Sequence, residues 1–310
     1  MSNQIIVDIA VIGAGPAGYS AAVYAVRAGY SVALWAGPEP GGQLMTTNLV
    51  ENFIGFPGGI LGPELMERCK KQSVDLGVKF IWDTVTAIEQ KDGQFVIGAG
   101  KEPGQAKAVI IATGAVAKWL GTESETKFKG KGVSACANCD GFFFKGKKVT
   151  VVGAGDVAME DTHTLVQYAE SVTVLVRGDE DKMRASRIMV ERAKANPKVK
   201  FMFNTEVDEF LGDQVLKSIR IKNSLTGETH ELPMDGVFMA IGHKPNTEMV
   251  RGLVDIDEGG WIKVKGTQTS VPGIFAAGDV ADKVYRQAIT SAGTGCMAAL
   301  DAKRYLEQQN

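Results

Sequence analysis

Two cysteines that lie three positions apart, Cys136 and Cys139, offer the most reactive chemistry in the sequence. A C-x-x-C pair can close a small disulfide and reopen it, and one of its thiols becomes nucleophilic when its pKa is lowered. Asp140 follows directly and is a candidate general acid for a leaving thiolate. Cys136, Cys139 and Asp140 are therefore candidate catalytic residues for thiol–disulfide exchange.

Other roles are open to these three residues. A zinc site would need four ligands, but the sequence has no second C-x-x-C and no H-x-x-x-H. The pair could instead be inert and buried, and Asp140 could cap a turn or a helix. We favour the redox role, and no metal is expected.

Two glycine-rich loops have the pattern that binds dinucleotides. They read G-A-G-P-A-G at residues 13–18 and G-A-G-D-V-A at residues 153–158. Each follows an apolar strand and opens a helix, which distinguishes the motif from a plain glycine turn. Its glycines make the turn tight and let the backbone approach a pyrophosphate, which lies on the helix N-terminus. Two such loops suggest sites for FAD and for a nicotinamide dinucleotide.

The elements around these loops predict an α/β fold with two Rossmann-like, three-layer ββα domains. The first loop lies between a strand at Val7–Ile12 and a helix at Ala17–Ala28. The second follows a strand at Val149–Val152, and its helix is expected to reach about Ala169. A last helix is expected from about Ser291 to the C-terminus.

Composition excludes several classes of protein. Hydrophobic residues make up 45% of the 310 residues, and 34 basic residues face 36 acidic ones. The chain therefore lacks the charge imbalance of a nucleic-acid-binding or membrane-surface protein. It has four cysteines, no apolar run long enough to span a bilayer and no signal-peptide pattern, so we expect a cytoplasmic protein.

Together these residues resemble the bacterial-type, low-molecular-weight thioredoxin reductases. The resemblance covers nearly the whole chain. It rests on the first glycine loop, G-G-Q-L at 41–44, E-N-F-I-G-F-P at 51–57 and C-x-x-C-D at 136–140. It continues through A-A-G-D at 276–279 and Y-R-Q-A-I-T-S-A-G-T-G at 285–295.

The resemblance implies a discontinuous FAD domain of residues 1–116 and 246–310, with an NAD(P)H domain of residues 117–245 that is inserted in it and carries the dithiol. Family members are homodimers. The FAD contacts that it implies are Gly13, Gly15, Pro16, Ala17, Gly18, Gly41, Gly42, Gln43, Leu44, Asn52, Ala112, Thr113, Gly114, Gly278, Asp279, Arg286, Gln287 and Ala288. The NAD(P)H contacts are Gly153, Gly155, Asp156, Ala158, Glu160, Arg177, Arg184, Ile241 and Gly242.

The implied mechanism passes hydride from the nicotinamide to the flavin, which then reduces the Cys136–Cys139 disulfide. Cys136 attacks the disulfide of thioredoxin, or of a thioredoxin-like protein, and Cys139 resolves the mixed disulfide. The nicotinamide and the dithiol compete for one flavin face, so the inserted domain rotates. We expect the hinges near residues 114–119 and 242–247.

One departure from the family concerns the electron donor. NADPH-dependent members carry His-Arg-Arg where this chain has Val176-Arg177-Gly178, and three acidic residues follow at 179–181. Arginine forks suit the 2′-phosphate of NADPH, whereas an acid such as Asp179 suits the free ribose hydroxyl of NADH. NADPH is the favoured donor, with Arg184 as a second contact. NADH and a non-nicotinamide donor such as ferredoxin remain open.

Two other functions fit parts of the sequence. A flavin dithiol oxidase shares the dithiol, but such proteins usually lose the second glycine loop, which is intact here. A flavin-binding redox sensor would not need the full set of Cys136, Cys139 and Asp140. Thioredoxin reduction is therefore the favoured function.

Overall fold

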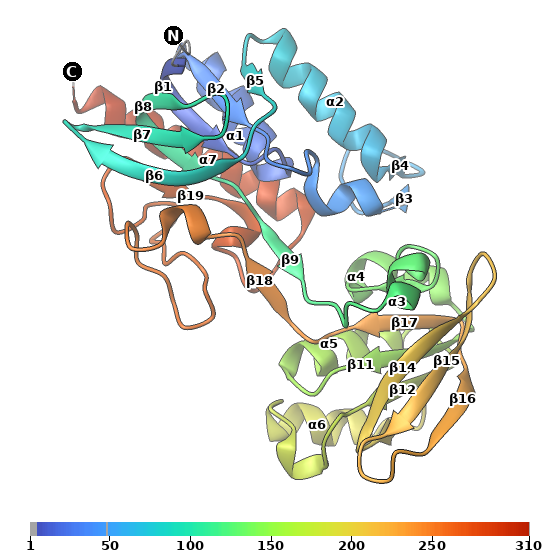
Figure 1. Cartoon of the computed structure of the whole chain (residues 1–310). Helices are drawn as coiled ribbons and strands as arrows, with labels where there is room; N and C mark the ends of the chain where they lie inside the picture. Colours follow the sequence, from blue (N-terminus) through green and yellow to red (C-terminus); the bar gives the residue numbers. More distant parts are fainter. Residues whose placement is uncertain (1–4, 48, 310) are drawn as a thin grey trace. The chain divides into compact units, whose positions relative to one another are not determined.

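The computed structural model describes residues 5–47 and 49–309 and divides the chain into two compact units (Figure 1). Unit 1 comprises residues 1–116 and 244–310, and unit 2 comprises residues 117–243. Each unit is built on its own sheet, and the central strands of both sheets are parallel. The predicted fold class, two Rossmann-like α/β units with the second inserted in the first, is therefore confirmed.

The sheet of unit 1 has seven strands. Four of them run in the order β5-β2-β1-β8, and β19 also pairs with β8; all these pairings are parallel. Strands β7 and β6 continue the sheet in antiparallel fashion. Their bounds are β1 Ile5–Ile12, β2 Val32–Trp35, β5 Lys79–Ile81, β6 Val85–Lys91, β7 Gln94–Ala99, β8 Gly104–Ile111 and β19 Ile274–Ala276. Strands β3 (Leu49–Val50) and β4 (Ile60–Leu61) form a separate small hairpin.

Three helices accompany this sheet: α1 (Pro16–Arg27), α2 (Gly62–Asp75) and α7 (Ala288–Glu307). One apolar cluster joins side chains of all three helices to alternate residues of β1, such as Ile9 and Val11. A second cluster takes the other residues of β1, such as Ala10 and Ile12. Both faces of the parallel strands are thus buried, which explains why these strands read as continuous apolar runs.

Unit 2 repeats the design around a five-stranded parallel sheet in the order β10-β17-β11-β12-β13. Three further strands, β14 to β16, form an antiparallel meander. The strands are β10 Val133–Ser134, β11 Lys148–Val152, β12 Ser171–Leu175, β13 Val199–Met202, β14 Thr205–Gly212, β15 Leu216–Asn223, β16 Thr229–Pro233 and β17 Gly236–Met239. The helices are α3 Glu123–Phe128, α4 Ala137–Asp140, α5 Asp156–Leu165 and α6 Arg187–Lys194.

The chain crosses between the units twice, and the two crossings pair as the short strands β9 (Ala115–Ala117) and β18 (His243–Pro245). On the side of unit 1, the Asn246 side chain donates to the carbonyl of Thr113 at 2.9 Å. On the side of unit 2, the N–H of Lys118 donates to the carbonyl of Gly242 at 2.8 Å. The crossings therefore coincide with the segments expected to act as hinges.

Two helix ends differ from the expected positions, and each has a local cause. Helix α7 begins at Ala288 rather than near Ser291, because the side chains of Gln287 and Thr290 form a capping box. Helix α5 ends at Leu165 rather than near Ala169. There the Lys198 ammonium group donates hydrogen bonds to the carbonyls of Val166 and Ala169, both at 2.9 Å, in place of further helical bonds.

A fully buried carboxylate orders the chain just after the first crossing. Glu125 of α3 has no exposed surface and accepts hydrogen bonds from the N–H groups of Leu120 and Gly121, at 3.0 and 2.9 Å. These bonds give hydrogen-bond partners to a charged group that would otherwise be buried without them. Thr122 caps the same helix by accepting from the N–H of Glu125.

Replacing this carboxylate is expected to destabilise unit 2. Glu125→Ala removes two hydrogen bonds to a charged acceptor and should lower the free energy of unfolding by about 2–4 kcal/mol in urea titrations. The matched control is Glu123→Ala, at an exposed position of the same helix, which should change it by less than about 1 kcal/mol. Equal losses for the two variants would contradict this role of Glu125.

Candidate functional site

The first glycine loop joins β1 to α1 through a close backbone contact. Gly13 has a φ of 109°, and a Cβ there would lie 2.3 Å from the carbonyl oxygen of Ala112. Gly18 is equally crowded, whereas a Cβ on Gly15 would meet nothing within 4 Å. Open space therefore lies at the N-terminus of α1, where the first N–H groups have no helical partners. This arrangement fits a pyrophosphate.

The second glycine loop has the same geometry between β11 and α5. Gly153 has a φ of 155°, and a Cβ there would lie 2.3 Å from the carbonyl oxygen of Ala240. A Cβ on Gly155 would again meet nothing within 4 Å. Ala158 takes the place of the third glycine and is fully buried. Each unit thus presents one open helix N-terminus that fits a dinucleotide.

Other residues expected to contact FAD converge on unit 1. Asn52 donates from its side chain to that of Gln287 at 3.4 Å, although the two lie 235 positions apart. The side chain of Gln43 donates to the carbonyl of Ala115 at 2.6 Å. Arg286 adopts a left-handed backbone with a φ of 49°, just before α7. Segments distant in the sequence are therefore brought together by one sheet and its helices.

Asp279 is the most perturbed acid of unit 1. Burial raises the pKa of its carboxyl group to about 6, against the lowering effect of the Ser291 hydroxyl, which donates to it at 2.9 Å. The neighbouring Gly278 has a φ of 74°, and its N–H donates to the hydroxyl of Thr294. A half-buried carboxyl group next to the first turn of α7 is suited to bind ligand hydroxyl groups.

All the residues expected to bind FAD lie in unit 1, and all those expected to bind NAD(P)H lie in unit 2. Within unit 1, Ala112, Thr113 and Gly114 follow β8, and Gly41 to Leu44 lie at the short helical turn that begins at Gly42. Within unit 2, Ile241 and Gly242 follow β17, and Glu160 lies exposed on α5.

The segment after β12 returns to the second glycine loop. The N–H of Arg184 donates to the carbonyl of Ala154 at 2.8 Å, and that of Ser186 donates to the Asp156 carboxylate at 2.8 Å. Arg177 and Arg184 are both exposed. The backbone of Arg184 therefore lies at the second glycine loop.

The acidic residues that follow Arg177 are partly neutralised. Asp179 pairs with Lys182 at 3.8 Å, and Glu180 forms an ion pair with Lys194. These exposed pairs are weak. They nevertheless reduce the repulsion that the acidic residues would exert on a phosphate.

The C-x-x-C pair forms a disulfide in unit 2. The S–S distance between Cys136 and Cys139 is 2.08 Å, and both residues are half-buried. Cys136 caps the one-turn helix α4. Within the described ranges, no group of three or more His, Cys, Asp or Glu side chains could hold a metal. The disulfide therefore argues against the zinc and the inert, fully buried alternatives.

Asp140 closes α4, one turn after Cys136, and its carboxylate accepts a hydrogen bond from the Ser134 hydroxyl at 2.5 Å. Burial raises the pKa of Asp140, and the Ser134 hydrogen bond opposes that rise. A carboxyl group that keeps its proton to a higher pH than usual is suited to protonate a thiolate. Ser134 was not predicted, because a serine before a C-x-x-C motif carries no signal of its own.

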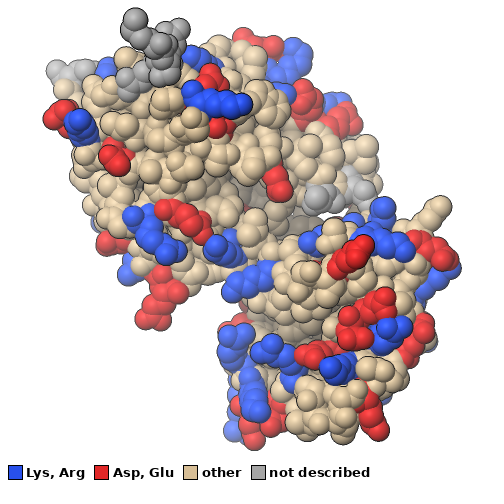
Figure 2. All heavy atoms as spheres, in the orientation of Figure 1, with Lys and Arg blue, Asp and Glu red and all other residues tan. Residues whose placement is uncertain are grey.

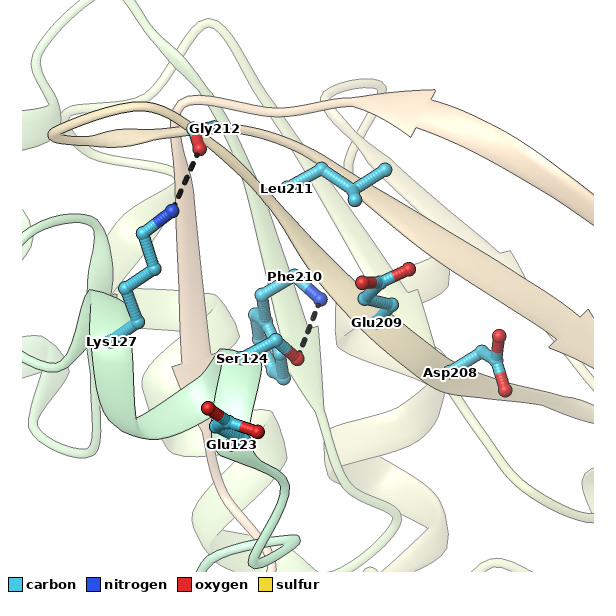
Figure 3. Close-up of a pocket in the computed structure, with 8 residues that line it drawn as sticks. All are labelled: Glu123, Ser124, Lys127, Asp208, Glu209, Phe210, Leu211 and Gly212. Atoms are coloured by element: carbon cyan, nitrogen blue, oxygen red, sulfur yellow. Dashed lines mark hydrogen bonds between the residues drawn. The ribbon is translucent and has the colours of Figure 1, made fainter.

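A surface groove of about 630 Å³ lies away from this chemistry, between α3 and β14 (Figure 3). Its lining includes three carboxylates, those of Glu123, Asp208 and Glu209. The Lys127 ammonium group donates to the carbonyl of Gly212, and the N–H of Phe210 donates to Ser124. An acidic groove without a glycine loop would repel a dinucleotide. It is not part of the candidate site.

Two dinucleotide-binding units and a disulfide in the second define the class of protein as a nucleotide-dependent disulfide oxidoreductase. The family model for pyridine nucleotide-disulphide oxidoreductases matches residues 7–295. The thioredoxin reductase of Mycolicibacterium smegmatis is 47% identical over 100% of this chain and 99% of its own length. That of Chlamydia trachomatis is 48% identical over 96% of this chain and 98% of its own.

A solved structure agrees with these relatives. The thioredoxin reductase from Giardia duodenalis matches with a TM-score of 0.93 and 40% identity, over 98% of this chain and 100% of that one. The chain therefore belongs to the pyridine nucleotide-disulphide oxidoreductases and, among them, to the thioredoxin reductase family. The resemblance inferred from the sequence motifs is confirmed.

Proposed function

We propose that the chain is a thioredoxin reductase that moves electrons from NAD(P)H through FAD to the Cys136–Cys139 disulfide and on to thioredoxin or a thioredoxin-like protein. The observation that carries the proposal is the position of this disulfide. It lies half-buried in the same unit as the second glycine loop, in a chain whose first glycine loop lies in another unit.

FAD would be held in unit 1 by the loop at residues 13–18, with Asn52, Asp279 and the turn at residues 286–288 as further contacts. When bound, the flavin supplies a two-electron carrier between the nicotinamide and the dithiol. The nicotinamide dinucleotide would be held in unit 2 by the loop at residues 153–158, with Arg177 and Arg184 beside it.

In the reduced dithiol, Cys136 attacks one sulfur of the substrate disulfide and forms a mixed disulfide. The other substrate sulfur leaves with a proton from Asp140. Cys139 then attacks the Cys136 sulfur, which releases the second substrate thiol and restores the Cys136–Cys139 disulfide. The dithiol loses two electrons and two protons, and the substrate gains both.

The surface around the dithiol suits a protein substrate. Phe142 and Phe143 follow the motif directly and are 56% and 39% exposed. The segment from residue 127 to residue 148 holds six lysines and one acid, Asp140, in a chain with a net charge of −2. Figure 2 shows basic and acidic side chains interspersed on the visible face of this unit. Exposed aromatic rings beside the dithiol favour a protein partner over a small disulfide.

Dimer formation, the other partner that the resemblance implies, is supported by an apolar stripe on α7. Ile289, Met297 and Leu300 are 40%, 47% and 39% exposed, and they lie on one face of that helix. Tyr24 of α1, the helix packed against α7, is 47% exposed. We propose that a second copy of the chain covers this stripe. In the described residues, no helix is long and apolar enough to cross a membrane.

The cysteines provide the test of the function. Wild-type protein with FAD should oxidise NAD(P)H in proportion to added thioredoxin. Cys136→Ser and Cys139→Ser should each lower that turnover at least about 100-fold while keeping the flavin, because each removes one half of the dithiol. Cys69→Ser, which changes a cysteine of unit 1, is the control and should keep turnover. Near-wild-type turnover by Cys136→Ser would contradict the proposal.

NADPH is the proposed donor, because Arg177 and Arg184 are exposed, the backbone of Arg184 bonds to the second loop, and two of the neighbouring acids are paired. NADPH should bleach the oxidised flavin faster than NADH in anaerobic mixing. Arg184→Ala should raise the KM for NADPH about tenfold or more and leave the KM for NADH unchanged. Arg187→Ala is the control, since that side chain pairs with Glu191. Faster bleaching by NADH would reverse the assignment, and slow bleaching by both would point to another donor such as ferredoxin.

The apolar stripe provides the test of the dimer. Wild-type protein should have twice the chain mass in light scattering, and Met297→Asp should lower that mass towards a monomer because it places a charge in the interface. Val215→Asp changes an apolar residue of unit 2 that is 54% exposed, and it should leave the mass unchanged. A wild-type monomer would exclude the proposed contact.

A further inference from the structure

One buried hydroxyl group links the attacking cysteine to the candidate acid. Ser134 ends β10 and is 8% exposed. Its oxygen accepts a hydrogen bond from the N–H of Cys136 at 3.1 Å, and its hydroxyl donates to the Asp140 carboxylate at 2.5 Å. A single side chain therefore ties together the two ends of the segment that carries the dithiol.

The local fold makes this link possible. Strand β10 ends at Ser134, Cys136 has extended backbone with a φ of −143°, and α4 then makes one turn to Asp140. The N–H of Asp140 donates to the carbonyl of Cys136 at 3.1 Å. The acid thus lies one helical turn from the cysteine, and both turn back towards the end of the strand.

Ser134 is the polar side chain that bonds to the Asp140 carboxylate. The elements packed most closely on α4 are α5 and the turn at residues 141–144, and that turn has no ionisable side chain. The ionisable side chains of α5 are Asp156, Glu160, Asp161 and His163. Burial raises the pKa of Asp140, and the Ser134 hydrogen bond opposes that rise.

We propose that Ser134 is a positioning residue for the proton transfer, because its hydroxyl group holds the Asp140 carboxylate in one orientation at the dithiol and stabilises it after its proton has left. The inference rests on the proposed function, since the proton goes to the sulfur that leaves during exchange. Asp140 regains a proton when the Cys139 thiol loses its own in the next step. Ser134 touches neither sulfur in this scheme and acts through Asp140.

The test compares the pH dependence of four variants. In Ser134→Ala, the ionised Asp140 loses a hydrogen bond, so Asp140 should stay protonated to a higher pH. The alkaline limb of kcat/KM for thioredoxin reduction should then move up by about one pH unit. Ser134→Thr keeps the hydroxyl and should restore the wild-type profile. Asp140→Asn should remove that limb, and adding Ser134→Ala to it should change nothing further.

A second readout does not depend on thioredoxin. After reduction with dithiothreitol, the rate at which iodoacetamide alkylates Cys136 is followed against pH by mass spectrometry. Ser134→Ala should shift this profile in the wild-type background and not in Asp140→Asn. Ser134→Gly makes the same test if Ser134→Ala does not fold. If Ser134→Ala shifts the alkylation profile as expected but the wild-type protein does not reduce thioredoxin, the proposed function would be wrong and the role of Ser134 would stand.

Two results would overturn the role of Ser134. One is a Ser134→Ala profile that superimposes on the wild-type profile in both readouts. The other is an equal shift in the Asp140→Asn background, because Ser134 would then act on the cysteines without the acid. Flavin content and the urea midpoint of each variant show that its fold is intact.

Discussion

Both units depend on the same close backbone contact, which is possible only because the residue that makes it is a glycine. At each strand-to-helix turn, a glycine approaches a carbonyl from a neighbouring strand, and a Cβ would lie 2.3 Å from that oxygen at Gly13 and at Gly153. The contact turns the chain directly into the helix, so the helix N-terminus points its free N–H groups into open space. The partner carbonyls belong to Ala112 and Ala240, which directly follow the equivalent strands β8 and β17. The two units are therefore variations of one design.

The remaining features of the site are additions to this design, and they differ between the units. Unit 1 adds a half-buried acid, Asp279, and a strained turn at Arg286. Unit 2 adds the segment with the disulfide between β10 and β11, directly before its own glycine loop. The dithiol and its acid lie within five consecutive residues of unit 2. Their positions relative to one another therefore do not depend on how the two units are arranged.

The glycine loops, the dithiol and the fold class could be predicted because each depends on short sequence patterns with few physical solutions. The helix ends could not, since they depend on contacts from elsewhere. Lys198 bonds to the carbonyls of Val166 and Ala169, just after α5, from 32 and 29 residues away, and the capping box of Gln287 and Thr290 starts α7 early. Ser134 was missed for a similar reason. Its importance lies in a hydrogen bond of 2.5 Å to Asp140, which the spacing of the residues does not predict.

The central claim is that one chain stores electrons in two places, a flavin in unit 1 and the Cys136–Cys139 pair in unit 2. Anaerobic titration of the flavin-loaded protein with dithionite tests it most directly. The account predicts that wild-type protein takes up four electrons per flavin, two in the flavin and two in the disulfide. The Cys136→Ser, Cys139→Ser double variant should take up two. Two electrons per flavin in the wild type would show that the disulfide does not exchange electrons with the flavin, and the proposed route would be wrong.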